Sequence, residues 1–299
     1  MTLWEGFLLG LVQGVTEVLP ISSTAHLILA QRLLGLNDIT ISFDVMMNFG
    51  SLIAILIYFR DIWLDLIVGT LNYIKITINV WLKKYPQLKK YVPRFRSMET
   101  EYSRNTSFYQ ASKQSAQTFL FLGIATLPAL MAGYLLKDWI ENNARTPFVI
   151  AIALIIGGIL LGIADRWGKK HKSLSELSPI NVIIIGFSQV LSLIPGFSRT
   201  GSTMIGGLSV GLNRKDSAAF AFLLGAPIIT IATIALLPEF IAEYSYSHAN
   251  ALAFITSGIV TYITLHILYR MVQKQSFNVF VVYRIVLGII LLALYTSIL

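Results

Sequence analysis

Long apolar stretches alternate with short polar segments along almost the whole chain. A helix needs about 20 apolar residues to cross the roughly 30 Å hydrocarbon core of a bilayer. Six stretches approach this length: residues 43–59, 116–136, 147–164, 217–237, 249–268 and 278–298. The pattern therefore predicts an all-α polytopic membrane protein with six transmembrane helices.

The region between the first two stretches has a different pattern. Its polar residues recur at helical spacing on one stripe of residues 62–82, which is typical of a helix that lies on a membrane surface. These residues are Asp65, Asn72, Lys75 and Asn79, continued by Lys83. Residues 83–115 are polar and rich in lysine and arginine. We expect residues 60–115 to form a cytoplasmic insertion, an amphipathic helix followed by a basic loop, without chemistry of its own.

Two further apolar segments are each interrupted by a proline, Pro20 and Pro195, that is followed by small hydroxyl residues. Neither half is long enough to cross a bilayer, so each segment is predicted to be a re-entrant helix pair. Broken backbone at membrane depth is tolerated where it is buried in protein or lines a wet cavity, so the two breaks should meet around a site. The alternative is an ordinary helix with a proline kink and serine caps.

The two broken segments resemble each other at an offset of 176 residues. The matched pairs are Gly10 with Gly186, Gln13 with Gln189, Ser22 with Ser198 and Thr24 with Thr200. This match predicts one membrane domain, residues 1–299, built from repeats at about 1–170 and 175–299. Each repeat contains three crossings, and an odd number makes the repeats inverted relative to each other.

Composition and charge agree with a membrane protein. The chain is 55% apolar and 13% charged, with a mean hydropathy of +0.70, which leaves too little polar surface for a soluble globule. The net charge of +8 lies mainly in loops on one side of the predicted crossings, so we assign it to membrane orientation rather than to nucleic acid. The basic loops are expected in the cytoplasm. Because the chain has no cysteine, disulfides, thiolate metal sites and cysteine nucleophiles are excluded.

Ionisable residues inside a membrane are costly and indicate function, and three lie in the broken segments: Glu17, His26 and Arg199. Gln13 and Glu17 share one helix face, as do Ser23 and His26. If the repeats meet, the arginine joins a carboxylate, a hydroxyl and an imidazole. This set suits phosphate chemistry, because a guanidinium can grip phosphate oxygens in a bidentate way.

Helix N-termini near Ser22 and across Ser198, Thr200 and Gly201 would help to bind an anion, and the glycine permits close approach. Ser23 would act as the nucleophile or orient water. His26 or Glu17 would be the general base, with Glu17 alternatively a metal ligand; the sequence does not choose.

These residues could also have purely structural roles. Glu17 and Arg199 could form an ion pair that only stabilises the fold, and His26 could be a packing residue. Arg284, a few residues inside the last span, is expected to extend toward the cytoplasmic surface rather than to take part in catalysis.

Residues Gln13 to His26, QGVTEVLPISSTAH, resemble the first motif of the bacterial undecaprenyl-diphosphate phosphatases linked to bacitracin resistance. Residues Pro195 to Thr203, PGFSRTGST, resemble the second motif. The resemblance covers nearly the whole chain. The chain departs from the family pattern at Ala25, which replaces the usual glycine, and in the basic insertion after Arg60, which is longer than in many members. The family has glutamate or glutamine at the position of Gln13, and the glutamine here argues against a metal site with two carboxylates.

The resemblance implies a set of active-site positions, a cation and a substrate. The implied positions are Glu17, Ser23, Thr24, His26, Ser198 and Arg199, with Ser23 as nucleophile and Arg199 as diphosphate binder. It also implies a divalent cation, Mg²⁺ or Ca²⁺, for activity. The implied reaction converts a C55 lipid diphosphate to the monophosphate in the bacterial inner membrane, at a pocket reached from the external side, and recycles the carrier for cell-wall precursors.

Other functions share this architecture. A lipid or solute transporter or flippase could use Arg199 to bind an anionic head group, but it would have no need of a nucleophile. A purely structural membrane protein would leave the intramembrane Glu, His and Arg without a role. The metal identity and the oligomeric state stay open, a homodimer included.

Overall fold

The computed structural model describes residues 1–36, 41–85, 106–243, 247–272 and 275–298, which fold into helices joined by short turns. The all-α prediction is confirmed. The helices are α1 (Leu3–Thr16), α2 (Ser23–Leu33), α3 (Ile41–Tyr58), α4 (Arg60–Lys84), α5 (Thr106–Leu135), α6 (Lys137–Trp139), α7 (Pro147–Trp167), α8 (Pro179–Val190), α9 (Arg199–Ser209), α10 (Arg214–Glu243), α11 (His248–Met271) and α12 (Asn278–Ile298).

Each of the six long apolar stretches is a helix: α3, α5, α7, α10, α11 and α12. Within the described residues, four helices are long and apolar enough to cross a membrane, namely those over Ser107–Leu135, Pro147–Trp167, Arg214–Ala242 and His248–Met271. Shorter apolar helices cover Ser42–Tyr58, Pro179–Leu193 and Asn278–Leu294. Some helices extend beyond the apolar stretches, as α10 does at both ends. The loop expected at 83–115 was wrong over 106–115: α5 begins at Thr106, because the polar residues before the apolar stretch continue the same helix.

The chain divides into two compact units, and the smaller one is Phe59–Gly123. It contains α4 and the first part of α5. Gly69 of α4 lies against Ser115 of α5, and the rings of Tyr73 and Tyr109 are 5.9 Å apart. The helix expected at 62–82 is therefore present. Of the basic loop expected at 83–115, residues 86–105 lie outside the described residues.

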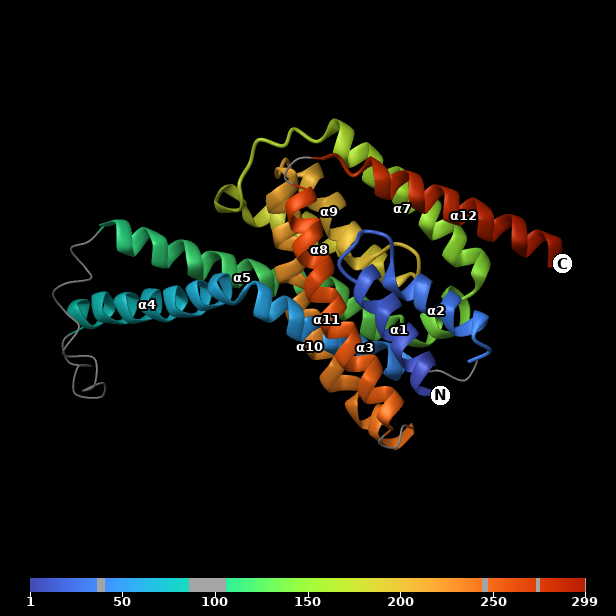
Figure 1. Cartoon of the computed structure of the whole chain (residues 1–299). Helices are drawn as coiled ribbons and strands as arrows, with labels where there is room; N and C mark the ends of the chain where they lie inside the picture. Colours follow the sequence, from blue (N-terminus) through green and yellow to red (C-terminus); the bar gives the residue numbers. More distant parts are fainter. Residues whose placement is uncertain (37–40, 86–105, 244–246, 273–274, 299) are drawn as a thin grey trace. The chain divides into compact units, whose positions relative to one another are not determined.

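The larger unit, Met1–Tyr58 with Ile124–Leu299, holds both broken segments. In it α1 packs against α11, α3 packs against α10 and α11, and α7 packs against α12 (Figure 1). Gly6, Gly10 and Gly14 line the side of α1 that faces α11. A Cβ atom at any of them would overlap a backbone carbonyl of α11, so the three glycines allow the close helix contact.

Both proline-containing segments are broken helices, as predicted. The chain leaves α1 at Thr16 and begins α2 at Ser23; it leaves α8 at Val190, passes through a 3₁₀ turn and begins α9 at Arg199. The N-caps, Ser22 and Ser198, both have positive φ, 76° and 69°. Each serine Oγ accepts a hydrogen bond from the backbone N–H three residues later. The two repeats therefore share one turn geometry at matched positions.

Candidate active site

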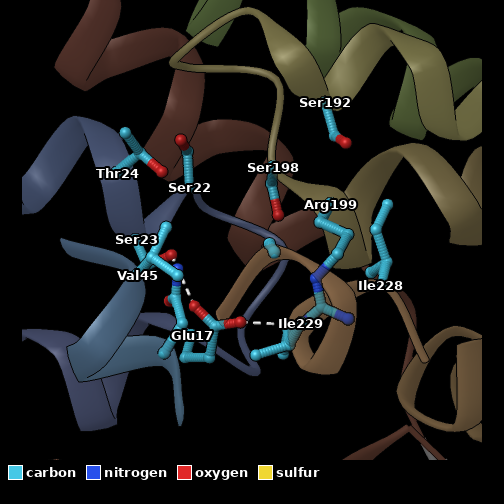
Figure 2. Close-up of a pocket in the computed structure, with 12 residues that line it drawn as sticks. Glu17, Ser22, Ser23, Thr24, Val45, Ser192, Ser198, Arg199, Ile228 and Ile229 are labelled. Carbon is cyan, nitrogen blue, oxygen red and sulfur yellow. Dashed lines mark hydrogen bonds and ion pairs between the residues drawn. The ribbon is translucent and has the colours of Figure 1, made fainter. Parts of the chain in front are cut away.

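The two breaks meet at a cavity of about 170 Å³ inside the larger unit. This is room for several water molecules, since a cavity needs about 10–15 Å³ to hold one. Figure 2 shows the side chains around it, contributed by both repeats. The lining residues are Glu17, Ser22, Ser23, Thr24, Val45, Asn48, Ser192, Ser198, Arg199, Ile228, Ile229 and Ala232.

Glu17 is the centre of the hydrogen-bond network in the cavity. Its Oε2 accepts from Ser23 Oγ at 2.7 Å and from Gln13 Nε2 at 2.9 Å. Its Oε1 forms an ion pair with Arg199 Nη2 at 2.6 Å (Figure 2). The carboxylate therefore touches the hydroxyl that it could deprotonate and the guanidinium that neutralises its charge.

Arg199 has donor capacity beyond this ion pair. Its Nη1 atom is buried and has no hydrogen-bond partner among the described residues. A Cβ on Gly225 of α10 would overlap the guanidinium, so the glycine makes the space in which the arginine lies. The alternative that Glu17 and Arg199 form an ion pair is therefore correct. The unsatisfied Nη1 shows that the pair does not use the whole guanidinium.

Two helices begin at the cavity. Ser22 and Ser23 mark the start of α2, and Ser198 and Arg199 mark the start of α9. The first turn of a helix leaves backbone N–H groups without intrahelical partners, and each N-terminus acts as roughly half a positive charge. The arrangement favours an anionic ligand between the two N-termini.

Five of the predicted site residues line the cavity together. They are Glu17, Ser23 and Thr24 from the first repeat and Ser198 and Arg199 from the second. The repeat and the two breaks thus predicted that these five residues lie close together.

Three further predicted residues, Gln13, Thr200 and Gly201, support the cavity wall without lining it. Gln13 is fully buried and donates to Glu17. The hydroxyl of Thr200 donates to the backbone carbonyl of Glu17 at 3.3 Å. Gly201 was expected to give an anion close approach. A Cβ there would instead meet a guanidinium nitrogen of Arg284, so the glycine accommodates that arginine.

His26 does not line the cavity either. Its Nδ1 lies 2.8 Å from the backbone oxygen of Ser22, and its Nε2 lies 2.6 Å from the hydroxyl of Tyr283. Both ring nitrogens are therefore engaged away from the Ser23 hydroxyl, which is hydrogen-bonded to Glu17 instead.

The prediction for Arg284 was wrong. The side chain is fully buried and does not extend toward the membrane surface. Its guanidinium donates to the carbonyl oxygens of Pro20 in the first break and of Gly196 and Phe197 in the second, at 2.9 to 3.0 Å. Turns expose carbonyls that no helix satisfies, and a buried arginine supplies five donors. Arg284 therefore ties the two breaks together.

Two polar cavity residues were missed by sequence reasoning, Asn48 on α3 and Ser192 in the 3₁₀ turn. Gln13 Nε2 donates to Asn48 Oδ1, so the Nδ2 group of the asparagine is not the atom that faces Gln13. A polar residue inside the apolar 43–59 stretch was the available signal for Asn48. Ser192 is one of several serines near the break and had no distinguishing signal.

Whether a divalent cation fits the cavity depends on the ligands that the lining residues offer. Glu17 is the single carboxylate at the cavity, and the described residues contain no cluster of three His, Cys, Asp or Glu side chains. Glu17 and Arg199 cancel in charge, so about two to three charges of a bound diphosphate would be only partly balanced by the helix N-termini. The residues fit Mg²⁺ or Ca²⁺ held by one carboxylate together with substrate phosphate oxygens and water.

Comparison with known proteins covers nearly the full chain. The family described as bacitracin resistance protein BacA matches residues 6–290. An undecaprenyl-diphosphatase of Gemmatimonas aurantiaca is 37% identical over 297 residues, 99% of both chains. An undecaprenyl-diphosphatase of Elusimicrobium minutum is 36% identical over 293 residues, 98% of both chains. One of Caldicellulosiruptor bescii is 32% identical over 297 residues, 99% of this chain and 98% of the relative.

Proposed function

The chain belongs to the bacitracin resistance protein BacA family, and on this basis we propose that it hydrolyses undecaprenyl diphosphate to undecaprenyl phosphate and phosphate. One observation in the cavity carries the chemistry. The Ser23 hydroxyl and the Glu17 carboxylate of the first repeat and the Arg199 guanidinium of the second form one chain of contacts, from Ser23 to Glu17 to Arg199. The reaction recycles the lipid carrier for peptidoglycan precursors and gives resistance to bacitracin.

The first step uses Ser23 as the nucleophile. Its Oγ attacks the terminal phosphorus and forms an O–P bond while its proton passes to Glu17. The bond from phosphorus to the bridging oxygen breaks, and its electron pair leaves with undecaprenyl phosphate. Arg199, which lines the cavity, holds the phosphoryl oxygens and neutralises the charge that they carry in the transition state.

The second step releases phosphate. Glu17 first gives the proton that it took from Ser23 to the departing undecaprenyl phosphate. Water then attacks the phosphoserine and passes a proton to Glu17, and Glu17 returns this proton to the serine oxygen as the O–P bond breaks. Thr24, Ser198 and the N-termini of α2 and α9 orient the phosphoryl group. A divalent cation bound through Glu17 and the diphosphate would supply the remaining positive charge.

We propose six crossings, α3, α5, α7, α10, α11 and α12, with α1–α2 and α8–α9 as re-entrant pairs in inverted repeats. Four long apolar helices and three shorter ones support a multi-pass membrane protein. The distribution of lysine and arginine supports cytoplasmic basic loops, so residues near 137–146 would face outward. The cavity would then be reached from the external side of the inner membrane.

The function is tested by phosphate release from undecaprenyl diphosphate, using purified protein in detergent with added Mg²⁺ or Ca²⁺. We expect release with either ion and a loss of at least about tenfold when a chelator replaces it, because one cation would balance much of the diphosphate charge. Undecaprenyl phosphate is the control substrate and should release none. If folded protein releases no phosphate under any of these conditions, the proposed phosphatase function is wrong. Transfer of labelled lipid across vesicles would then test the flippase alternative.

Asn48→Leu is expected to raise KM about 10- to 100-fold and to change kcat little, because a hydrogen bond to a charged phosphate contributes about 1.5–3 kcal/mol. Asn48 Oδ1 is occupied by Gln13, so the Nδ2 group is the part that can donate to substrate. Initial rates against substrate concentration give both constants. Asn142→Leu, at an exposed asparagine away from the cavity, is the control. An unchanged KM in Asn48→Leu would exclude this contact.

A further inference from the structure

His26 and Tyr283 form a connected pair just outside the cavity. His26 lies in the first turns of α2 and Tyr283 lies on α12, and their rings stack with centroids 5.7 Å apart and an interplanar angle of 11°. The hydroxyl of Tyr283 is 2.6 Å from His26 Nε2. On the other side of the ring, His26 Nδ1 is 2.8 Å from the carbonyl oxygen of Ser22.

These contacts fix the proton positions on the imidazole. A backbone carbonyl only accepts hydrogen bonds, so Nδ1 must carry a hydrogen and donate it to Ser22. In the neutral ring Nε2 is then an acceptor, and the Tyr283 hydroxyl donates to it. Neither nitrogen is left to take a proton from Ser23, whose hydroxyl donates to Glu17.

The carbonyl that His26 holds belongs to a strained residue. Ser22 has φ of 76°, in the left-handed region that costs a non-glycine residue energy and persists where surroundings over-determine it. Its Oγ accepts from the backbone N–H groups of Ala25 and Gly196, and its carbonyl accepts from the N–H and Nδ1 of His26. Ser23 follows directly, so the Ser22 conformation sets where the attacking hydroxyl points.

The second repeat provides an internal comparison. Ser198 has the same positive φ and the same Oγ cap, but the position that matches His26 is Ser202. The Ser202 hydroxyl is buried and has no hydrogen-bond partner among the described residues, so no side chain there braces the Ser198 carbonyl. The imidazole brace occurs at the break that carries the proposed nucleophile and is missing from the break that carries Arg199.

We propose that His26 and Tyr283 are positioning residues: Tyr283 holds the His26 imidazole, and His26 Nδ1–H holds the Ser22 carbonyl so that Ser23 points at the phosphorus. This inference rests on the proposed phosphatase function. It assigns Tyr283 a part in the reaction and makes His26 act through Ser22 rather than as the general base.

Two isosteric variants of His26 separate positioning from base catalysis. An asparagine places its amide nitrogen where Nδ1 lies, whereas a glutamine reaches the position of Nε2. We expect His26→Asn to keep kcat within about tenfold of wild type, and His26→Gln and His26→Ala to lose about 100-fold, with KM near the wild-type value in all three. Tyr283→Phe should lower kcat about three- to tenfold. The control is Tyr262→Phe on α11, because this tyrosine is exposed to the same degree, 43% for Tyr262 against 42% for Tyr283.

The outcomes that overturn the proposal are distinct from failure of the phosphatase function, which wild-type protein without activity would reveal. If wild type is active and His26→Asn is as inactive as His26→Gln, the hydrogen bond from Nδ1 to Ser22 does not account for the role of His26. If the glutamine variant is the more active, the imidazole acts through Nε2. Full activity of Tyr283→Phe removes Tyr283 from the mechanism. A measurement on wild type does not depend on the activity of any variant: ¹⁵N chemical shifts of the four histidines, with His26 assigned from His26→Asn, should show hydrogen on Nδ1. A bare Nδ1 contradicts the proposal.

Discussion

Ser23→Ala is expected to lower kcat for phosphate release by a factor of about 10³ or more and to leave the melting temperature unchanged. The hydroxyl lines the cavity and donates to Glu17 at 2.7 Å, so its removal deletes the attacking atom. It has no structural duty of comparable weight, because the N-cap of α2 is Ser22. Rates and thermal melts of the detergent-solubilised protein measure both quantities.

Two other serine variants complete this experiment. Ser209→Ala, at the far end of α9, should match wild type in rate and stability. Ser22→Ala removes the cap and the bond to Gly196, so it should lower the melting temperature as well as the rate. Acid-quenched reactions with substrate labelled in the terminal phosphate should trap radioactivity on wild type. Activity of Ser23→Ala within tenfold of wild type would show that water attacks directly.

Arg284→Met is expected to have the largest effect on stability, about 3–5 kcal/mol, because it leaves several buried carbonyls without donors at about 1–3 kcal/mol each. Methionine replaces much of the apolar volume but supplies no hydrogen bond to Pro20, Gly196 or Phe197. The melting temperature should fall by several degrees. Phosphate release should fall too, since the released turns carry Ser23 and Arg199.

A matched substitution tests whether the effect belongs to this position. Arg270→Met, at an exposed arginine of α11, should change stability by less than about 0.5 kcal/mol. Arg284→Lys retains the charge, but a single ammonium cannot reach carbonyls of both breaks as the guanidinium fork does. We expect it to recover only part of the stability. An Arg284→Met protein as stable as Arg270→Met would mean that the breaks hold together without this residue.

The helices and the positions of the two breaks were predictable because each depends on local pattern. Apolar length marked α7, α10 and α11, and proline followed by hydroxyl residues marked the breaks before Ser23 and Arg199. The 176-residue repeat then supplied the one long-range fact that no local pattern contains, namely that the two breaks face each other.

The roles of Arg284 and His26 were not predictable, because they depend on tertiary contacts. An arginine near the end of an apolar span usually extends to the membrane surface. Arg284 is buried instead, because it donates hydrogen bonds to carbonyls of two turns that are distant in the sequence. The spacing of Ser23 and His26 on one helix suggested a shared site. The turn at Ser22 instead draws the imidazole to its own carbonyl, and Tyr283 on α12 holds it there.

The bond from Arg284 to Pro20 joins residues 264 positions apart in the chain. The ribosome therefore makes both turns of the site before it makes the arginine that joins them. Until α12 packs against the rest of the chain, the carbonyls of Pro20, Gly196 and Phe197 lack this donor. We expect the two breaks to take their final positions only after α12 has been synthesised.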